Sequence, residues 1–319
     1  MIDVRGLTKD YNGFTAVRGI DFHVNPGEVF GLLGPNGAGK TSTINMLIGL
    51  ARITSGSVSI AGYDANQDMN KIKAIIGVVP DESNLYDELS GFENLCFCGA
   101  LYGMTRRDRE ARAQELLRQF GLTEAASKAF KAYSRGMKRK LTIAAAIMHR
   151  PKILFLDEPT TGIDVASARQ IRRLLQELNA AGVVILLTTH YIEEAERLCH
   201  RIALIVKGRI VRIGTPQELI AACQHETIIQ ISVGGPIAAL LDEMVHTFPE
   251  VTVEKAGEES VRLHSAHEMD VFPVVAWLHD RGTKVLEARL VKPTLESAFV
   301  TLTNIDSAEM SKEKEGRRK

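Results

Sequence analysis

The most constraining feature of this chain is a glycine-rich stretch that joins a short apolar run to a helical pattern. The stretch reads Gly34-Pro35-Asn36-Gly37-Ala38-Gly39-Lys40-Thr41 and fits the pattern G-x-x-x-x-G-K-[ST] at every fixed position. The apolar run at 29–33 is typical of a buried strand, and residues 41–48 favour a helix. Glycines allow a tight turn whose backbone N–H groups face an anion at the helix N-terminus. We therefore expect a phosphate-binding loop; the alternative is a glycine turn with a chance lysine.

Two side chains of this loop have specific expected roles. Lys40 would reach the β- and γ-phosphates of a nucleotide, and the Thr41 hydroxyl would ligate Mg²⁺. The residues expected to contact the nucleotide in this stretch are Gly34, Pro35, Asn36, Gly37, Ala38, Gly39, Lys40, Thr41 and Ser42.

Length, charge and composition narrow the class of protein. A chain of 319 residues with 45% hydrophobic and 24% charged residues is expected to form one large or two medium soluble domains. Its formal net charge of zero gives no electrostatic reason to expect nucleic acid as a partner. No run approaches the ~20 apolar residues that span a bilayer, and residues 1–5 lack signal-peptide character. We expect a protein that is cytoplasmic or peripheral to a membrane. The four cysteines lack C-x-x-C spacing, which indicates reduced thiols rather than a metal site.

The hydrophobic pattern predicts an α/β domain with a helical insertion. Strand-like runs lie at 17–24, 29–33, 57–60, 75–79, 153–156 and 183–187, and a hairpin is expected at 202–206 and 210–213. Residues 82–150 instead carry helical patterns, at 92–102, 106–120 and 135–149. A helix at 165–181, capped by Asp164, separates two continuous apolar strands, which implies a parallel sheet.

The C-terminal part has a different order of elements. After a short helix at 217–222, the patterns run strand 228–233, helix 237–248, strands 251–255 and 261–263, helix 269–281, strand 284–290 and helix 294–301. The order β-α-β-β-α-β predicts a small α+β module of ferredoxin-like type. We expect domains at 1–222 and 223–305 and a disordered tail at 306–319. Dimer support and regulatory sensing are both open as roles of the module.

Two further segments place chemical groups at strand ends. Asp157 and Glu158 follow the apolar run 153–156, so Asp157 is expected to hold Mg²⁺ and Glu158 to polarise a water for attack on the γ-phosphate. His190 follows the next strand and could contact the γ-phosphate or orient the water. The alternative for Asp157 and Glu158 is a pair of acids on the protein surface, and the alternative for His190 is a histidine that caps a helix.

A helix start at Ser134 is a second candidate anion site. Ser134 is a good N-cap, and Gly136 leaves room for a close ligand. The alternative is a capped, solvated helix terminus, because the basic cluster at 135–140 is typical of a ligand-facing or solvent-facing patch.

Taken together, these motifs resemble the nucleotide-binding subunit of an ATP-binding-cassette (ABC) transporter over about residues 1–222. Residues 34–41 match its Walker A motif, residues 133–137 look like its signature, and residues 162–164 resemble its D-loop, which includes Asp164. Asp157 and Glu158 match Walker B and its glutamate, and His190 matches the switch histidine. Tyr11 lies where the family keeps an aromatic residue that stacks on adenine. The resemblance implies a P-loop NTPase fold and hydrolysis of ATP with Mg²⁺.

Two positions depart from the family pattern. Arg135 replaces the first glycine of the signature pair, so the resemblance assigns phosphate contacts to Ser134 and Gly136 only. Asp81 stands where the family keeps a glutamine. Its carboxylate could ligate Mg²⁺, or it could slow hydrolysis by adding negative charge near the γ-phosphate.

The variant signature and the segment 292–299 look like the drug-resistance and nodulation-factor export subfamily. This resemblance implies a peripheral subunit on the cytoplasmic face of the membrane, with a separate integral membrane permease as partner. It also implies a head-to-tail homodimer in which Ser134 and Gly136 of one copy close over ATP held by Lys40 of the other. The alternative is a soluble ABC ATPase that acts on ribosomes or DNA. ATPases of that kind carry long coiled coils or basic linkers, and this sequence has neither, so no nucleic acid partner is expected.

Overall fold

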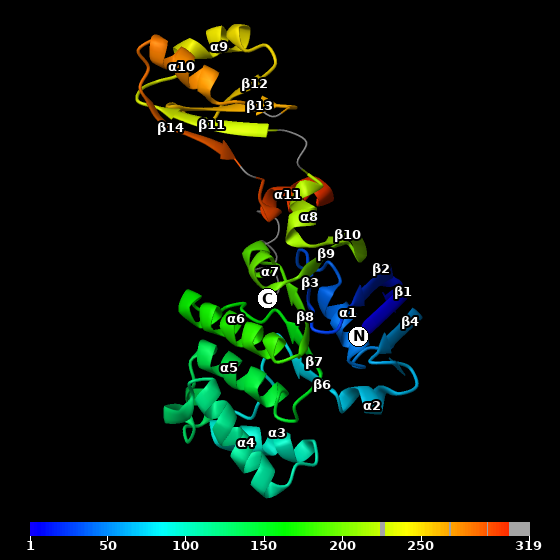
Figure 1. Ribbon diagram of the computed structural model, residues 1–319. Coiled ribbons are helices and arrows are strands. Elements are labelled where there is room, and N and C mark those ends of the chain that lie inside the picture. Colours follow the sequence, from blue (N-terminus) through cyan, green and yellow to red (C-terminus); the bar gives the residue numbers. More distant parts are fainter. Residues whose placement is uncertain (224–226, 268, 292, 306–319) are drawn as a thin grey trace. The chain divides into compact units, whose positions relative to one another are not determined.

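The computed structural model describes residues 1–223, 227–267, 269–291 and 293–305, which form two compact units (Figure 1). The first unit is Met1–Pro216 together with the described residues after Thr301, and the second is Gln217–Thr301. The division therefore falls slightly before the boundary at 222–223 that the sequence patterns favoured. The expected tail at 306–319 lies outside the described residues.

A six-stranded sheet forms the centre of the first unit. Its strand order is β10-β9-β3-β8-β7-β6. The bounds are β3 (Val29–Leu33), β6 (Ile76–Val79), β7 (Ile153–Asp157), β8 (Val184–Thr189), β9 (Arg201–Val206) and β10 (Arg209–Gly214). Strands β6, β7, β8, β3 and β9 are parallel, and only the β9–β10 hairpin is antiparallel. The parallel sheet expected from the continuous apolar strands is confirmed, and every residue of β3, β7 and β8 is buried.

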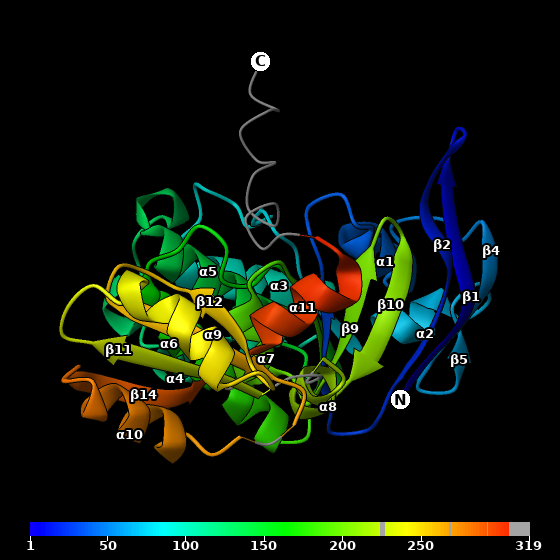
Figure 2. The ribbon, with the colours of Figure 1, turned by 90° about the horizontal axis from the view of Figure 1, so that it is seen from above.

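A second, antiparallel sheet has the order β2-β1-β4-β5 (Figure 2). Its strands are β1 (Ile2–Tyr11), β2 (Phe14–Val24), β4 (Ser55–Ile60) and β5 (Tyr63–Asp64). Strand β1 was absent from the sequence-based prediction. Its pairing with β2 shifts register after Val4 and again after Leu7, so the apolar alternation that identifies a strand breaks in the middle of β1.

Helix α1 (Lys40–Leu47) packs into the apolar core shared by the two sheets (Figure 1). Its Ile44 and Leu47 join a buried cluster with Phe30 of β3, Phe155 of β7 and Val4 of β1. Burial of each such side chain is worth about 1.5–3 kcal/mol, so the start of α1 is held firmly at the end of β3. The small helix α2 (Met69–Lys73) lies in the connection between β5 and β6.

The helical insertion is present between β6 and β7, as expected. It contains α3 (Gly91–Leu101), α4 (Arg106–Gln119), the single 3₁₀ turns η1 (Thr123–Ala125) and η2 (Phe130–Ala132), and α5 (Arg135–Ala146). Helix α6 (Val165–Ala180) joins β7 to β8, and α7 (Ile192–Leu198) follows β8. Four of these helices begin at a residue whose side chain accepts a hydrogen bond from the N–H three residues later, namely Ser90, Thr105, Ser134 and Asp164. Each such cap stabilises a helix start by about 1 kcal/mol.

The second unit carries a four-stranded antiparallel sheet of order β12-β13-β11-β14. Its elements are β11 (Thr227–Val233), η3 (Ala238–Leu240), α9 (Leu241–Thr247), β12 (Thr252–Lys255), β13 (Ser260–Ser265), α10 (Phe272–Asp280) and β14 (Val285–Val291). Most of α8 (Pro216–Ala221) and α11 (Leu295–Thr303) also belongs to it, although Pro216 and the residues after Thr301 are assigned to the first unit. Met244 of α9 and Leu278 of α10 pack with Ile229, Ile231 and Leu263 on one face of this sheet. The element order agrees with the expected β-α-β-β-α-β, with β13 lying between β11 and β12. Kinship with ferredoxin-like modules stays a prediction.

Candidate nucleotide site

The loop between β3 and α1 has the backbone that an anion nest needs. Gly39 is left-handed, with φ +103°, and a Cβ there would lie 2.6 Å from the carbonyl oxygen of Ala16. A larger residue at Gly39 would therefore be strained by its backbone and blocked by its neighbour. The amide of Thr43 bonds the carbonyl of Gly39, so the helix begins directly from the loop and directs its unpaired N–H groups toward it.

Lys40 is almost completely buried, with 4% of its surface exposed. Its Nζ donates to the carbonyl oxygens of Gly34, at 2.6 Å, and Pro35, at 3.0 Å. The same Nζ lies 3.6 Å from Oε1 of Glu158. Lys40, which is expected to bind phosphate, therefore lies across its own loop and approaches Glu158, the candidate base.

Glu158 stands at the centre of a polar cluster. Its Oε2 lies 2.9 Å from Nδ1 of His190 and accepts a hydrogen bond of 2.8 Å from the Thr161 hydroxyl. Its backbone is left-handed, with φ +48°, and its amide bonds the carbonyl of Thr188. Burial alone would raise the pKa of Glu158, but the neighbouring His190, Lys40 and Thr161 together lower it to about 2. The carboxylate is therefore ionised over the whole neutral range.

Asp157 and Thr41, both expected as Mg²⁺ ligands, are neighbours. The Asp157 carboxylate is hydrogen-bonded by the hydroxyls of Thr188 and Thr41. Burial raises the pKa of Asp157; the two hydroxyls oppose that shift, and the charges of Glu158 and Asp81 add to it. Among the described residues no group of three or more His, Cys, Asp or Glu side chains forms a metal cluster. A hydroxyl, one buried carboxylate and nucleotide phosphates form a donor set that suits Mg²⁺.

Asp81 follows β6, and its exposed side chain is close enough to Asp157 to raise the pKa of that carboxyl. Its backbone carbonyl accepts a hydrogen bond of 3.1 Å from Nη1 of Arg139. Sequence patterns do not decide between a metal-binding and an inhibitory role for Asp81, and both stay open at this point.

Arg139 is a buried residue beside the candidate site that the sequence analysis missed. It was included in a basic cluster at 135–140 that was expected to face a ligand or solvent, but for Arg139 this is wrong because only 7% of its surface is exposed. Its guanidinium donates to five backbone carbonyl oxygens, those of Pro80, Asp81, Asp157, Glu158 and Pro159. One side chain of α5 therefore fixes the ends of both β6 and β7. The only feature of the sequence that could have pointed to Arg139 is that it is a second arginine, one turn after Arg135 on α5.

The start of α5 carries the two signature residues. Ser134 is exposed, and its Oγ accepts a hydrogen bond of 3.3 Å from the amide of Met137, so the expected cap is present. Gly136 is buried, and a Cβ there would lie 2.2 Å from Oγ of Ser167 on α6. We expected the missing side chain of Gly136 to leave room for a ligand, but Ser167 on α6 of the same chain occupies that space. Only the backbone of Gly136 could approach a nucleotide.

Asp164 and Tyr11 are the remaining expected contacts. Asp164 caps α6 by accepting a hydrogen bond of 2.9 Å from the Ser167 amide, and the resulting bonds lower the pKa of its exposed carboxyl. Tyr11 ends β1 with 43% of its surface exposed, and Nζ of Lys9 lies 4.6 Å from the centre of its ring. An exposed aromatic ring beside a cation can stack on a base.

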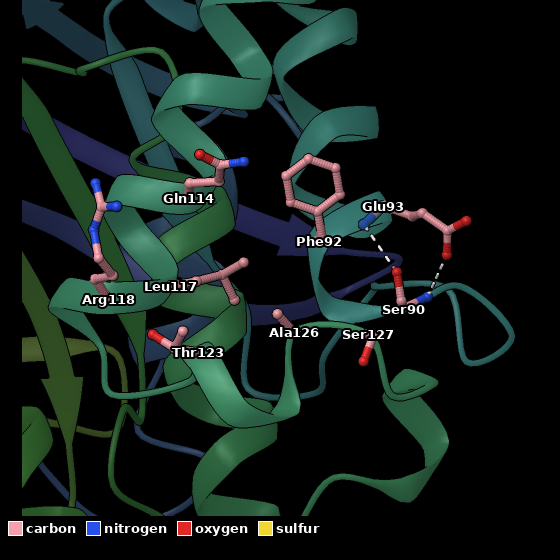
Figure 3. A pocket seen from close by; sticks show the side chains of 9 residues that line it. All are labelled: Ser90, Phe92, Glu93, Gln114, Leu117, Arg118, Thr123, Ala126 and Ser127. Atoms are coloured by element: carbon pink, nitrogen blue, oxygen red, sulfur yellow. Dashed lines mark hydrogen bonds between the residues drawn. The ribbon is translucent and has the colours of Figure 1, made fainter.

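A separate pocket lies in the helical insertion, away from these residues (Figure 3). Its volume is about 650 Å³, and Phe92 of α3, Leu117 of α4 and Ala126 supply its apolar lining. The reciprocal hydrogen bonds between Ser90 and Glu93 form part of its rim. This pocket contains none of the residues expected to bind the nucleotide.

The fold and the site define a P-loop nucleotide hydrolase, with a phosphate loop, a carboxylate pair and a histidine at one edge of a parallel sheet. The family model described as ABC transporter matches residues 17–161. The chain is 40% identical to the linearmycin resistance ATP-binding protein LnrL of Bacillus subtilis (strain 168), over 95% of this chain and 98% of that protein. It is 39% identical to the Nod factor export ATP-binding protein I of Paraburkholderia xenovorans (strain LB400), over 95% and 96% respectively.

Solved structures agree with these sequence relatives. An ATP-binding subunit of an ABC transporter superposes with a TM-score of 0.64 at 32% identity, over 70% of this chain and 92% of that one. A dimeric post-hydrolysis state of the ATP-binding cassette MJ0796 with ADP and Pi has a TM-score of 0.63 at 27% identity, over 67% and 98%. The chain belongs to the ABC transporter ATP-binding proteins: it binds ATP and is an ATPase. The alternative of a ribosome- or DNA-directed ATPase has no support.

Among the described residues, no helix combines the length and the apolar character that crossing a bilayer requires.

Proposed function

We propose that this chain is the ATPase of an export complex, that it works with Mg²⁺ as a head-to-tail homodimer, and that it drives a separate membrane permease from the cytoplasmic face. The observation that carries the proposal is the cluster of Lys40, Thr41, Asp157, Glu158 and His190 at the carboxyl edge of one parallel sheet. Each member has the chemistry that one step of ATP hydrolysis requires.

Bound Mg²⁺ would neutralise phosphate charge, and Thr41 and Asp157 would hold it. Lys40 and the loop amides would bind the phosphates, which requires Nζ of Lys40 to exchange the carbonyls of Gly34 and Pro35 for phosphate oxygens. Glu158 would accept the proton of the attacking water, a contribution of about 10²–10⁴ in rate. His190 would orient the carboxylate or contact the γ-phosphate, since it lies beside Oε2 of Glu158.

The relatives support export as the direction of transport. They are named for linearmycin resistance, Nod factor export and daunorubicin/doxorubicin resistance, and the first two of these sequence matches extend over nearly the whole chain. We propose that the cargo is a small compound of the resistance or export kind that these names describe.

A second copy would complete the site. Ser134 and Gly136 begin α5, whereas the phosphate loop begins α1, so the two signature residues belong to another element of the unit. The dimeric state of the MJ0796 cassette supports pairing of two such units. Mixed variants test this arrangement. We expect Lys40→Ala and Ser134→Arg to be inactive alone and to regain ATPase activity when mixed, because one composite site of a mixed dimer is intact. Failure of the mixture to regain activity would contradict the head-to-tail dimer.

The helical insertion offers a surface for the permease. Phe97 and Leu101 lie one turn apart on α3, with 39% and 70% of their surfaces exposed, and Tyr86 packs edge-on against Phe97. Exposed aromatic clusters of this kind are typical of protein–protein contacts. We expect the double variant Phe97→Ser, Leu101→Ser to lose copurification with the membrane subunit while keeping its basal ATPase activity. Phe272→Ser is the control, because Phe272 is an aromatic residue of the second unit with 71% of its surface exposed. Unchanged copurification of the double variant would remove this surface from the proposal.

A further inference from the structure

Among the strands that the structure describes, β14 is an edge of the second unit's sheet. It ends the strand order β12-β13-β11-β14, and β11 pairs with it along one side. All five residues from 286 to 290 are exposed, and Leu286 and Leu290 expose 58% and 53% of their surfaces. By contrast, its neighbour β11 alternates between buried and half-buried residues. An exposed edge strand presents unpaired backbone groups to another strand.

The two ends of β14 carry apolar residues on the face that the helices cover. Leu290 is paired with Ile229 and Ala288 with Ile231, and both isoleucines belong to the buried core. Beyond a register shift that leaves Leu286 without a partner in β11, Val285 is paired with the buried Val233, so this end of β14 also reaches the apolar face. The apolar face of the sheet therefore continues to its outermost strand, where it meets solvent.

The sequence of β14 is self-complementary. It reads Val285-Leu286-Glu287-Ala288-Arg289-Leu290-Val291. Counting outward from Ala288 in the two directions, Glu287 corresponds to the oppositely charged Arg289, and a leucine and then a valine follow on both sides. An antiparallel partner of the same sequence, centred on Ala288, would place Ala288 opposite Ala288 and Glu287 opposite Arg289 on both sides of the axis. Cross-strand pairs of these kinds stabilise a sheet, whereas like charges in opposition destabilise it.

We propose that β14 of one copy pairs antiparallel with β14 of a second copy about a two-fold axis at Ala288. The two four-stranded sheets then form one continuous sheet, and both copies contribute the same segment, as a two-fold interface requires. The strand that pairs with β14 is that of a second copy rather than an unrelated strand, because the symmetric sequence of β14 matches residue for residue only with a partner of the same sequence. Within one copy Glu287 and Arg289 lie 3.7 Å apart on an exposed surface, where an ion pair contributes little, so both are available to cross-strand partners.

This contact is independent of nucleotide, and so its test is separate from that of the composite ATP site. The full chain should sediment as a dimer in nucleotide-free, low-salt buffer. In a homodimer of either single variant, Glu287→Arg or Arg289→Glu, both cross-strand pairs between positions 287 and 289 carry like charges. Each variant should therefore raise the dissociation constant of the dimer about tenfold or more. The double variant Glu287→Arg, Arg289→Glu restores both pairs and should restore the dimer.

Mixing the two single variants gives the sharpest result. In the mixed pair, two arginines of one copy face two glutamates of the other, so a heterodimer should form although neither variant forms a homodimer. A variant that merely failed to fold could not be rescued in this way. A wild-type chain that stays monomeric without nucleotide, or single variants that do not combine, would overturn the proposal and leave the edge to a strand of another protein.

Cross-linking fixes the register. Ala288→Cys places the new thiol on the axis, where directly opposed Cβ atoms are about 4.5–5.5 Å apart, and mild oxidation should give a disulfide-linked dimer. Glu287→Cys is the matched control, because position 287 of the second copy lies diagonally across the axis, beyond the reach of a disulfide. Equal cross-linking of both variants, or of neither, would exclude the axis at Ala288.

Discussion

Nζ of Lys40 lies 3.6 Å from Oε1 of Glu158, and both side chains are almost fully buried. The cation that would bind phosphate therefore interacts with the carboxylate that would accept a proton. Burial raises the pKa of Glu158, but His190 lowers it most and the charge of Lys40 lowers it further, which makes Glu158 a weak base. Phosphate that draws Lys40 away would remove the share of this effect that is due to Lys40, so nucleotide binding would strengthen Glu158 as a base.

Glu158→Gln tests the role of the base. We expect the rate of ATP hydrolysis to fall by about 10²–10⁴, because the amide cannot accept the proton, while the affinity for ATP is retained. Single-turnover hydrolysis and titration with a fluorescent ATP analogue measure the two quantities. Glu177→Gln on the exposed face of α6 is the control for loss of a negative charge. Wild-type turnover in Glu158→Gln would remove this residue from the chemistry.

Two neighbouring carboxylates should affect stability in opposite directions. The pKa of Glu158 is lowered, so its ionised form stabilises the fold above pH ~4.5, and this contribution is lost as the pH falls toward about 2. The pKa of Asp157 is raised, so its ionised form destabilises the fold at neutral pH. At pH 7 without nucleotide, Glu158→Gln should lower the melting temperature and Asp157→Asn should raise it.

The pH series provides the check on both variants. The deficit of Glu158→Gln relative to wild type should shrink between pH 5 and pH 3, measured by thermal unfolding with Mg²⁺ absent. The gain of Asp157→Asn should also shrink as the wild-type carboxyl becomes protonated. Shifts of the same sign for both variants at pH 7 would contradict the two opposite pKa directions.

The sequence was sufficient wherever the signal was local or followed from parallel strands. The phosphate loop is one contiguous segment, and Asp157, Glu158 and His190 meet because neighbouring parallel strands end at the same edge. What it could not supply are contacts that depend on three-dimensional packing. Arg139 resembled any basic residue of a solvated helix start, and only the position of α5 against β6 and β7 buries it.

Arg139→Met should lower both stability and turnover. The change leaves buried carbonyls at the ends of β6 and β7 without their donor, which costs at least about 2 kcal/mol in unfolding free energy. Because Arg139 positions the backbone of Glu158 and Asp81, we expect kcat to fall more than KM for ATP rises. Arg139→Lys should recover only part of the loss, since one ammonium cannot bridge the same set of oxygens.

The control for Arg139 is Arg135→Met, an exposed arginine one turn earlier on the same helix. Chemical denaturation and steady-state kinetics on both variants separate a general effect of charge from the loss of the buried contacts. Equal kinetics and stability for Arg139→Met and Arg135→Met would show that the buried guanidinium has no positioning role.

Asp81→Gln distinguishes the two roles of the acidic residue after β6. Burial is the main cause of the raised pKa of Asp157, and the charge of Asp81 adds to it, so removing that charge should favour the ionised metal ligand and increase basal ATPase activity. Glu82→Gln, the adjacent exposed acid, should leave the rate unchanged. A lower rate with a raised Mg²⁺ requirement in Asp81→Gln would instead identify Asp81 as a metal ligand.

Gly136→Ala tests why the signature keeps this glycine. A Cβ at Gly136 would meet Oγ and Cβ of Ser167 at 2.2 and 2.7 Å, so we expect a loss of about 1–3 kcal/mol in unfolding free energy from overpacking between α5 and α6. Ser167→Gly removes both obstructing atoms, at the cost of a glycine in a helix. In a double-mutant cycle the combined variant should therefore be more stable than the sum of the single losses. If stability is rescued but ATPase activity is not, the backbone of Gly136 also serves the composite site; strictly additive losses would contradict the packing explanation.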